Sequence, residues 1–187
     1  MKSDITSALM RVLPFVIALV FLGMAMKKGR IARDKIYLVQ PASVARYLTW
    51  CVLFFVFILV TEFALAKVGL LGIDKWNHAL IPSIIRIAGA VILAPLVEEI
   101  ILRGVLLSKL IEKGLNQHVA IVLQAMVFVA LHSFAYQGTL SSQIAIVQSL
   151  VDGILYGYAR QNTGSLYTPI TMHIMGNLIA TVERFIV

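Results

Sequence analysis

Long runs of apolar residues, separated by short polar connectors, are the feature that most constrains this chain. A membrane-spanning helix requires roughly 20 mostly apolar residues, and the 187-residue sequence is 60% hydrophobic and only 13% charged. Its mean hydropathy is +0.91, and its apolar content would fill about five or six spans. These values exclude a soluble globular domain and a protein with a single anchor. Because a bilayer admits only helices and closed barrels, the sequence predicts one all-α membrane domain, a polytopic helix bundle.

The apolar runs predict six or seven transmembrane helices. Five of the runs cover approximately residues 12–26, 47–66, 119–136, 141–160 and 167–187. A sixth run, 80–110, is interrupted by Pro95, and its 31 residues would measure about 46 Å as a straight helix, longer than a hydrocarbon core of about 30 Å. Proline removes a backbone donor and disfavours helix at the preceding residue. We therefore expect one helix over 82–94 and another over 95–113, and the total depends on whether Pro95 kinks or separates them.

The basic residues report topology. Lys and Arg number 16 against 9 Asp and Glu, but they lie mainly between the apolar runs, so no nucleic-acid partner is expected. The densest basic group follows the first run and predicts a cytoplasmic loop by the positive-inside rule; it comprises Lys27, Lys28, Arg30, Arg33 and Lys35. If Pro95 only kinks its helix, Lys109, Lys113 and Arg160 fall on the same side as this loop. The one cysteine, Cys51, gives no disulfide framework and no Cys-rich metal site.

Ionisable residues are costly inside a membrane, and the first group of them lies just after Pro95. Glu99 and Arg103 are four residues apart, so on a helix they share a face and can neutralise each other. Glu98 points about 100° away, and its own i+4 neighbour is Leu102, which gives it no local partner. A structural ion pair is the simpler interpretation of Glu99. Desolvation makes Glu98 a carboxyl group able to accept a proton near neutral pH, as a general base must.

Two further polar pairs lie on later helices. Phe128 and His132 are four residues apart, as are His173 and Asn177, so each pair shares a helical face. A lone intramembrane histidine is more often a helix–helix hydrogen-bonding residue, but donors such as His173 and Asn177 could hold an oxyanion. One unpaired glutamate, two histidines and one asparagine on three helices together form a hydrolytic constellation.

In chain order these motifs read E-E-x-x-x-R, F-x-x-x-H and H-x-x-x-N. The set resembles the CPBP family of intramembrane proteases, which includes the type II CAAX prenyl endopeptidases and the bacterial Abi-like members. The resemblance spans about residues 95–177 and implies a four-helix catalytic core with variable flanking spans. We assign the core to 80–187, and the flanking helices with the basic loop to 1–79. The chain departs from the family pattern at Leu102, Val127 and Val129, which concerns substrate fit.

The resemblance implies a role for each motif residue. The catalytic set consists of Glu98, His132, His173 and Asn177. The supporting set consists of Glu99, Arg103 and Phe128. In the implied mechanism Glu98 accepts a proton from a water, the resulting hydroxide attacks a peptide carbonyl, and a histidine with Asn177 stabilises the oxyanion.

A zinc-dependent version of this site would use Glu98, His132 and His173 as three ligands with an open fourth position. We instead expect a site without a metal or other cofactor. The chain lacks the H-E-x-x-H spacing of common zinc proteases, and Asn177 is not a typical zinc ligand.

Other polar positions in the apolar runs have simpler interpretations. Asp152 could line a cavity, but the simpler expectation is a hydrogen-bonded packing residue or a partner for a nearby arginine. Glu62 and Arg86 are expected to extend toward the membrane interfaces. Gly153 and Gly157 form a GxxxG motif, which predicts a closely packed helix face.

The resulting prediction is an endopeptidase that cuts a membrane-anchored peptide or protein near its C-terminus or anchor. Compact loops and the lack of a eukaryotic-style targeting segment favour a multi-pass protein of a bacterial inner membrane, with the lipid bilayer and the substrate as its partners. The alternative is a non-catalytic peptide-binding or bacteriocin self-immunity protein with the same fold, because the resemblance extends to such relatives. A small transporter is disfavoured, since one helix break without a matching one is evident.

Overall fold

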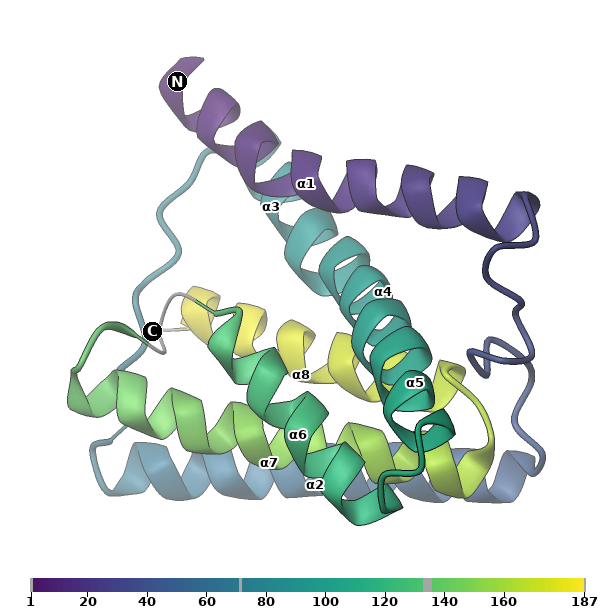
Figure 1. The fold of residues 1–187 in the computed structure, drawn as a ribbon. Helices are drawn as coiled ribbons and strands as arrows, with labels where there is room; N and C mark the ends of the chain where they lie inside the picture. The colour runs from purple at the N-terminus through teal and green to yellow at the C-terminus, as the bar shows by residue number, and fades with distance from the viewer. Residues whose placement is uncertain (1, 71, 133–135, 187) are drawn as a thin grey trace.

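The computed structural model describes residues 2–70, 72–132 and 136–186, which form six helical rods and no strand. One rod is assembled from five consecutive segments, and the other five are single helices (Figure 1). The elements are α1 (Lys2–Lys27), α2 (Val44–Lys67), α3 (Leu80–Ile87), η1 (Ala88–Leu93), α4 (Ala94–Glu99), η2 (Ile100–Leu106), α5 (Leu107–Glu112), α6 (Gln117–Ala130), α7 (Leu140–Thr163) and α8 (Tyr167–Ile186). The prediction of an all-α protein is confirmed.

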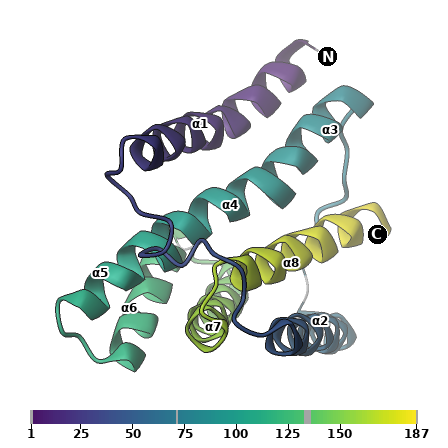
Figure 2. The same cartoon turned by 90° about the vertical axis from the view of Figure 1, so that its right-hand side faces the viewer.

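The long rod from α3 to α5 crosses the molecule obliquely and separates two groups of helices (Figure 1). On one side, α1 runs along the first part of the rod and contacts α3 and η1 (Figure 2). On the other side, α8 contacts α2, α7 and the rod, and α6 packs against α7 and α5. This arrangement brings the polar residues of α4, α6, α7 and α8 toward one another.

The rod runs without a break from Leu80 to Glu112, over 33 residues. Of the two alternatives predicted for Pro95, the one with separate helices over 82–94 and 95–113 is therefore wrong. The reason is the π-helical register of η1 and η2, which flank α4. The N–H of Ala94 donates to the carbonyl of Gly89, five residues back. A π turn is wider than an α turn, and it accommodates the ring of Pro95 that would otherwise clash with the preceding turn. The sequence pattern shows the proline but not this change of register.

Among the residues that the structure describes, three helices are long and apolar enough to cross a membrane: Asp4–Lys27, Val44–Lys67 and the rod Leu80–Glu112. The apolar helix Gln117–Ala130 is shorter. Although α7 and α8 have 24 and 20 residues, they are less apolar because their inward faces carry polar side chains. The apolar runs predicted from the sequence therefore form helices, and the polar side chains of these helices point into the interior of the molecule.

The predicted close-packing face of α7 is confirmed. A Cβ atom added at Gly157 would lie 2.8 Å from Cγ2 of Ile121, and one added at Gly153 would lie 3.1 Å from Cβ of Ala125. Both neighbours belong to α6. Glycine is therefore required at these positions by the close approach of the two helices.

The connector 28–43 is fastened to the far end of the rod and of α7. Arg160 is buried, its guanidinium lies 3.6 Å from the ring centroid of Tyr37, and it donates hydrogen bonds to Ser108 and Gln161. The hydroxyl of Ser108 in turn donates to the backbone carbonyl of Lys35. The connector, the end of the rod and the end of α7 therefore meet at one end of the molecule, but Arg160 fastens them internally instead of lying in an exposed loop.

Candidate active site

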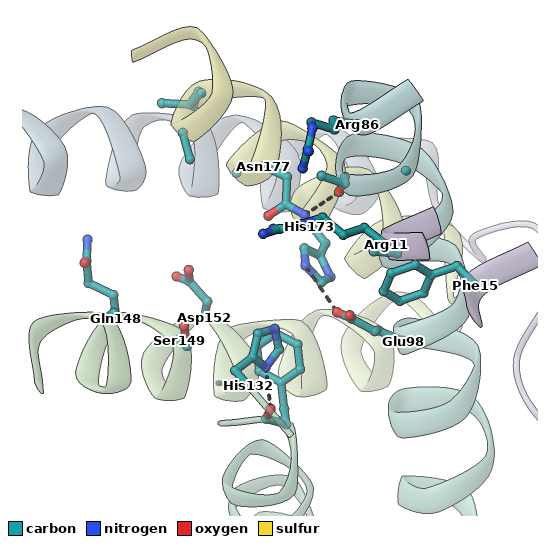
Figure 3. A pocket seen from close by; sticks show the side chains of 18 of the residues that line it. Arg11, Phe15, Arg86, Glu98, His132, Gln148, Ser149, Asp152, His173 and Asn177 are labelled. Atoms are coloured by element: carbon teal, nitrogen blue, oxygen red, sulfur yellow. Dashed lines mark hydrogen bonds and ion pairs between the residues drawn. The ribbon is translucent and has the colours of Figure 1, made fainter. Parts of the chain in front are cut away.

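A cavity of about 1080 Å³ lies between the rod and helices α6, α7 and α8, with contributions from α1 and α2. All four residues of the predicted catalytic set line it, from three separate stretches of the chain (Figure 3). They are Glu98, His132, His173 and Asn177. Phe128 lines the same cavity, whereas Glu99 and Arg103 lie behind its wall, fully buried. The structure therefore brings together the residues that the sequence placed in one site.

The adjacent residues Glu98 and Glu99 occupy different environments. The side chain of Glu98 is 20% exposed and faces the cavity, while that of Glu99 is 0% exposed. Both belong to the short α4 segment, where consecutive side chains point about 100° apart. The predicted inequivalence of the two carboxylates is confirmed.

Behind the cavity wall, Arg103 is held by several groups. Its Nη1 donates to Oε1 of Glu99 at 2.8 Å, and its Nη2 donates to the carbonyl of Gly153 at 3.2 Å. Its guanidinium also lies over the rings of Phe128 and Tyr156, at 4.7 and 5.1 Å from their centroids. The predicted Glu99–Arg103 pair is thus formed, and it ties the rod to α6 and α7.

His173 stands between the two glutamates. Its Nδ1 lies 2.9 Å from Oε1 of Glu99, and its Nε2 lies 3.7 Å from Oε2 of Glu98. Because a carboxylate only accepts hydrogen bonds, Nδ1 carries the proton toward Glu99. The expectation that Glu98 has no ionic partner held only for its own helix, since the partner comes from α8. Glu99 has a second role besides its ion pair with Arg103, because it also orients His173.

Two aromatic rings fix the plane of His173. Tyr156 stacks on the imidazole with centroids 5.1 Å apart, and Phe128 meets it edge-on at 5.6 Å. Phe128 also meets the ring of His132 edge-on, at 4.7 Å. Phe128 therefore separates and orients both histidines.

His132 lies two residues beyond the end of α6 and turns its ring back along the helix. Its Nδ1 donates to the backbone carbonyl of Phe128 at 2.7 Å, since a carbonyl is an acceptor only. This bond places the proton on Nδ1 and satisfies one of the carbonyl groups that the helix end leaves without an intrahelical donor.

Asn177 is positioned by a consequence of Pro95. In the π register of η1 the carbonyl of Gly89 accepts from residue 94, five positions on, so the carbonyl of Ala90 would next accept from residue 95. Pro95 has no N–H to give. The side-chain Nδ2 of Asn177 donates to this carbonyl instead, at 2.8 Å. The proline thus leaves free the acceptor that holds Asn177 at the cavity.

Several site residues were missed or misread from the sequence. Tyr156, buried against His173, resembled an ordinary packing residue, and its only sequence signal is the i,i+4 spacing from Asp152. Asp152 lines the cavity.

Glu62 does not extend to an interface but accepts a hydrogen bond from Gln148 at 2.8 Å. Arg86 likewise turns inward and pairs with Asp4 of α1, as described below.

A zinc ion at this site would need Glu98, His132 and His173 arranged as its ligands. Within the part of the chain that the structure describes, no group of three or more His, Cys, Asp or Glu side chains is arranged to hold a metal ion. Glu98, His132 and His173 therefore do not form a ligand set in this arrangement, and no chemical step is assigned to a metal.

The fold and the site together define a helical membrane protein whose polar residues gather around one internal cavity. A model of the family "Type II CAAX prenyl endopeptidase Rce1-like" matches residues 78–179. The match covers more than half of the chain, and the protein belongs to this family, as the three motifs predicted. Searches of curated proteins and of solved structures gave no match. Family membership implies protease activity, and together with the three long apolar helices it makes this a membrane protein.

Proposed function

We propose that the protein is an intramembrane endopeptidase that uses Glu98 to activate a water. Its substrate is a membrane-associated peptide or protein, cut near its C-terminus or anchor. The observation that carries this proposal is the pair formed by Oε2 of Glu98 and Nε2 of His173, 3.7 Å apart on the wall of the cavity. The two residues come from helices 75 positions apart in the chain (98 to 173).

The proton on Nδ1 of His173 makes this pair chemically useful. With that proton directed to Glu99, the neutral imidazole presents Nε2 as an acceptor toward the carboxylate of Glu98. Nε2 of His173 and the carboxylate of Glu98 are both acceptors, so one additional proton shared between them stabilises the pair. A pair that gains stability by taking up a proton is suited to general-base chemistry.

The reaction then follows in two steps. Glu98 takes a proton from water while the water oxygen bonds to the peptide carbonyl carbon, and the carbonyl π electrons move onto its oxygen. Collapse of this tetrahedral intermediate breaks the C–N bond, and the proton held by Glu98 passes to the departing nitrogen. The oxyanion is stabilised by the second N–H of Asn177, whose first N–H is committed to Ala90, together with His132 or a protonated His173.

The membrane arrangement we propose has six spans, with the rod, α6, α7 and α8 as the catalytic core. The continuous rod supports six spans over seven. The connector 28–43, with most of the basic residues predicted to be cytoplasmic, meets the ends of the rod and of α7 at one end of the molecule. The compact connectors favour a bacterial inner membrane.

The test is cleavage of membrane-anchored peptides by purified wild-type protein and by Glu98→Gln, in the same detergent, with and without a zinc chelator. Loss of a general base lowers the rate on the order of 10²–10⁴-fold, and we expect a loss of this size with the helical fold retained. The chelator should leave the wild-type rate unchanged. Arg30→Gln, an exposed change in the basic connector, is the matched control.

Full activity of Glu98→Gln would refute the glutamate mechanism, and a rate abolished by the chelator would replace it with a metal-dependent one. Specific peptide binding by both proteins without cleavage by either would favour the non-catalytic binding function.

A further inference from the structure

The charged side chains that line the cavity are separated by sign. Three are carboxylates and three are guanidiniums; they are Glu62, Glu98, Asp152, Arg11, Arg86 and Arg184. In Figure 3, Arg11 and Arg86 lie on the same side of the cavity as His173 and Glu98, and Asp152 lies on the other side beside Gln148 and Ser149. The cavity therefore has an arginine end, defined here by Arg11, Arg86 and Arg184, and an opposite acidic end.

The arginine end is built by contacts between α1, α3, the connector before α3 and the end of α8. Arg86 donates to Asp4 at 2.9 Å and to Ser7 at 3.2 Å, and Nδ1 of His78 lies 3.2 Å from the same Asp4 carboxylate. Arg184 lies over the ring of Trp76, which meets the ring of His78 edge-on. A single carboxylate, that of Asp4, is thus shared by Arg86 and His78, and the positive charge at this end exceeds the negative.

Two guanidinium donors remain without a protein acceptor. Among the described residues Arg11 makes no hydrogen bond or ion pair, and Nε of Arg86 is buried with no hydrogen-bond partner. Arg86 is itself largely buried, with 10% of its side chain exposed. A buried donor with no partner is costly, and both arginines line the cavity. Arg11 is exposed, so only the buried Nε of Arg86 carries this cost. An anionic ligand between the two guanidinium groups would supply an acceptor for both.

Arg11 is held close to the site residues by its neighbours on α1. Ser7 and Arg11 are four residues apart on one helical face, and Ser7 accepts from Arg86. The next residue, Val12, packs directly against Gly89 of η1. Gly89 precedes Ala90, the residue whose carbonyl holds Asn177. In Figure 3 the side chain of Arg11 extends from α1 toward His173 and Asn177.

The acidic end adjoins a second hollow, an apolar groove of about 510 Å³ between α2 and α7. The groove and the cavity share Ile58, Glu62, Gln148 and Asp152. This groove gives apolar surroundings to a substrate segment anchored in the membrane. The other end, with its excess positive charge, suits the polar terminus of the same substrate.

We propose that Arg11 and Arg86 form a subsite that binds the free C-terminal carboxylate of the substrate. The inference rests on the proposed protease function and adds a direction to it: the anchored part lies toward α2 and α7, and the released fragment lies toward α1. Guanidinium groups bind carboxylates through paired, charge-assisted hydrogen bonds. Such a subsite sets the distance between the cut and the end of the substrate, because the arginines fix the carboxylate at a set distance from Glu98.

The test uses one N-terminally palmitoylated peptide in two forms, with a free C-terminal carboxylate and with a C-terminal carboxamide. Wild-type kcat/KM should favour the carboxylate form by about 10- to 100-fold, the range expected for one lost charge-assisted hydrogen bond. In Arg11→Gln this ratio should fall to about 1, and in Arg11→Lys it should be partly retained. Arg30→Gln removes the same charge outside the cavity and should keep the wild-type ratio.

Equilibrium binding of the same two peptides to Glu98→Gln, with and without Arg11→Gln, separates this proposal from the proposed function. If wild type cleaves neither peptide but Glu98→Gln binds the carboxylate form selectively through Arg11, the protease function fails and the subsite stands. Equal cleavage and equal binding of the two forms would overturn the subsite. A loss in Arg11→Gln that is the same for both peptides and varies with the anionic lipid content of the vesicles would also overturn it, and would assign Arg11 to lipid headgroups.

Discussion

Helix α1 and the helices around the cavity distribute apolar and polar residues in opposite directions. The apolar stretch of α1 has none of its residues buried inside the molecule, and side chains such as Val20 and Phe21 are exposed. In the rod, by contrast, Glu99 and Arg103 are fully buried. In lipid there is no hydrophobic gain from burying an apolar side chain against another helix. Polar contacts and close packing therefore hold the helices around the cavity together, while α1 contributes charge to the cavity and an exposed apolar surface.

The largest expected effect comes from removing one side of the buried ion pair. Arg103→Ala leaves Glu99 buried and without its cation, and breaking a buried pair in this way costs about 3–5 kcal/mol. We expect a loss of this order in the free energy of unfolding, followed by thermal or denaturant unfolding in detergent. The matched change Arg30→Ala in the exposed connector should stay within about 0.5 kcal/mol. A loss below about 1 kcal/mol for Arg103→Ala would contradict the view that the polar interior stabilises the core.

A smaller effect is expected from Pro95→Ala. Alanine restores an N–H at position 95, which then competes with Asn177 for the carbonyl of Ala90. A hydrogen bond contributes about 0.5–1.5 kcal/mol, so the peptide-cleavage rate should fall by about 2- to 10-fold while thermal stability is kept. Pro14→Ala is the control, because Pro14 also lies inside a helix but on exposed α1. Equal rates for wild type and Pro95→Ala would show that Asn177 does not depend on the proline.

The smallest effect on the free energy of unfolding is expected from a substitution on the exposed face of α1. Phe21 is 64% exposed whereas Phe128 is 5% exposed and touches both histidines. We expect Phe21→Ala to change the free energy of unfolding by less than about 0.5 kcal/mol, against about 3–5 kcal/mol for Phe128→Ala. Thermal unfolding of the two variants in one detergent gives the comparison. A large loss for Phe21→Ala would mean that another protein surface covers this face of α1.

Features that depend on spacing within one helix could be predicted from the sequence. The apolar runs located the helices, the i,i+4 spacing paired Glu99 with Arg103, and the GxxxG motif located the contact between α6 and α7. The same reasoning distinguished the two adjacent glutamates. In each case helical periodicity alone fixes which side chains share a face.

Features that depend on the meeting of different helices could not be predicted in this way. Spacing within its own helix gave Glu98 no partner. The structure supplies one from another helix, His173 of α8. The sequence left open whether Pro95 kinks or divides the rod. A π register, which keeps the rod continuous, leaves no clear sequence pattern. The spacing within α7 also gave no sign that Arg160 is buried against Tyr37 of the connector 28–43. A single sequence carries no information on which distant faces come together.

The fastening of the connector 28–43 implies an order of assembly during synthesis. Tyr37 and Val39 accept hydrogen bonds from Leu166 and Ser165, and Ala42 donates to Thr163. The connector leaves the ribosome early, but its partners in the turn between α7 and α8 are made more than a hundred residues later. Contacts so far apart in the chain form late in folding. The hydrogen bonds that fasten the connector between α1 and α2 can therefore form only after the turn between α7 and α8 has been made.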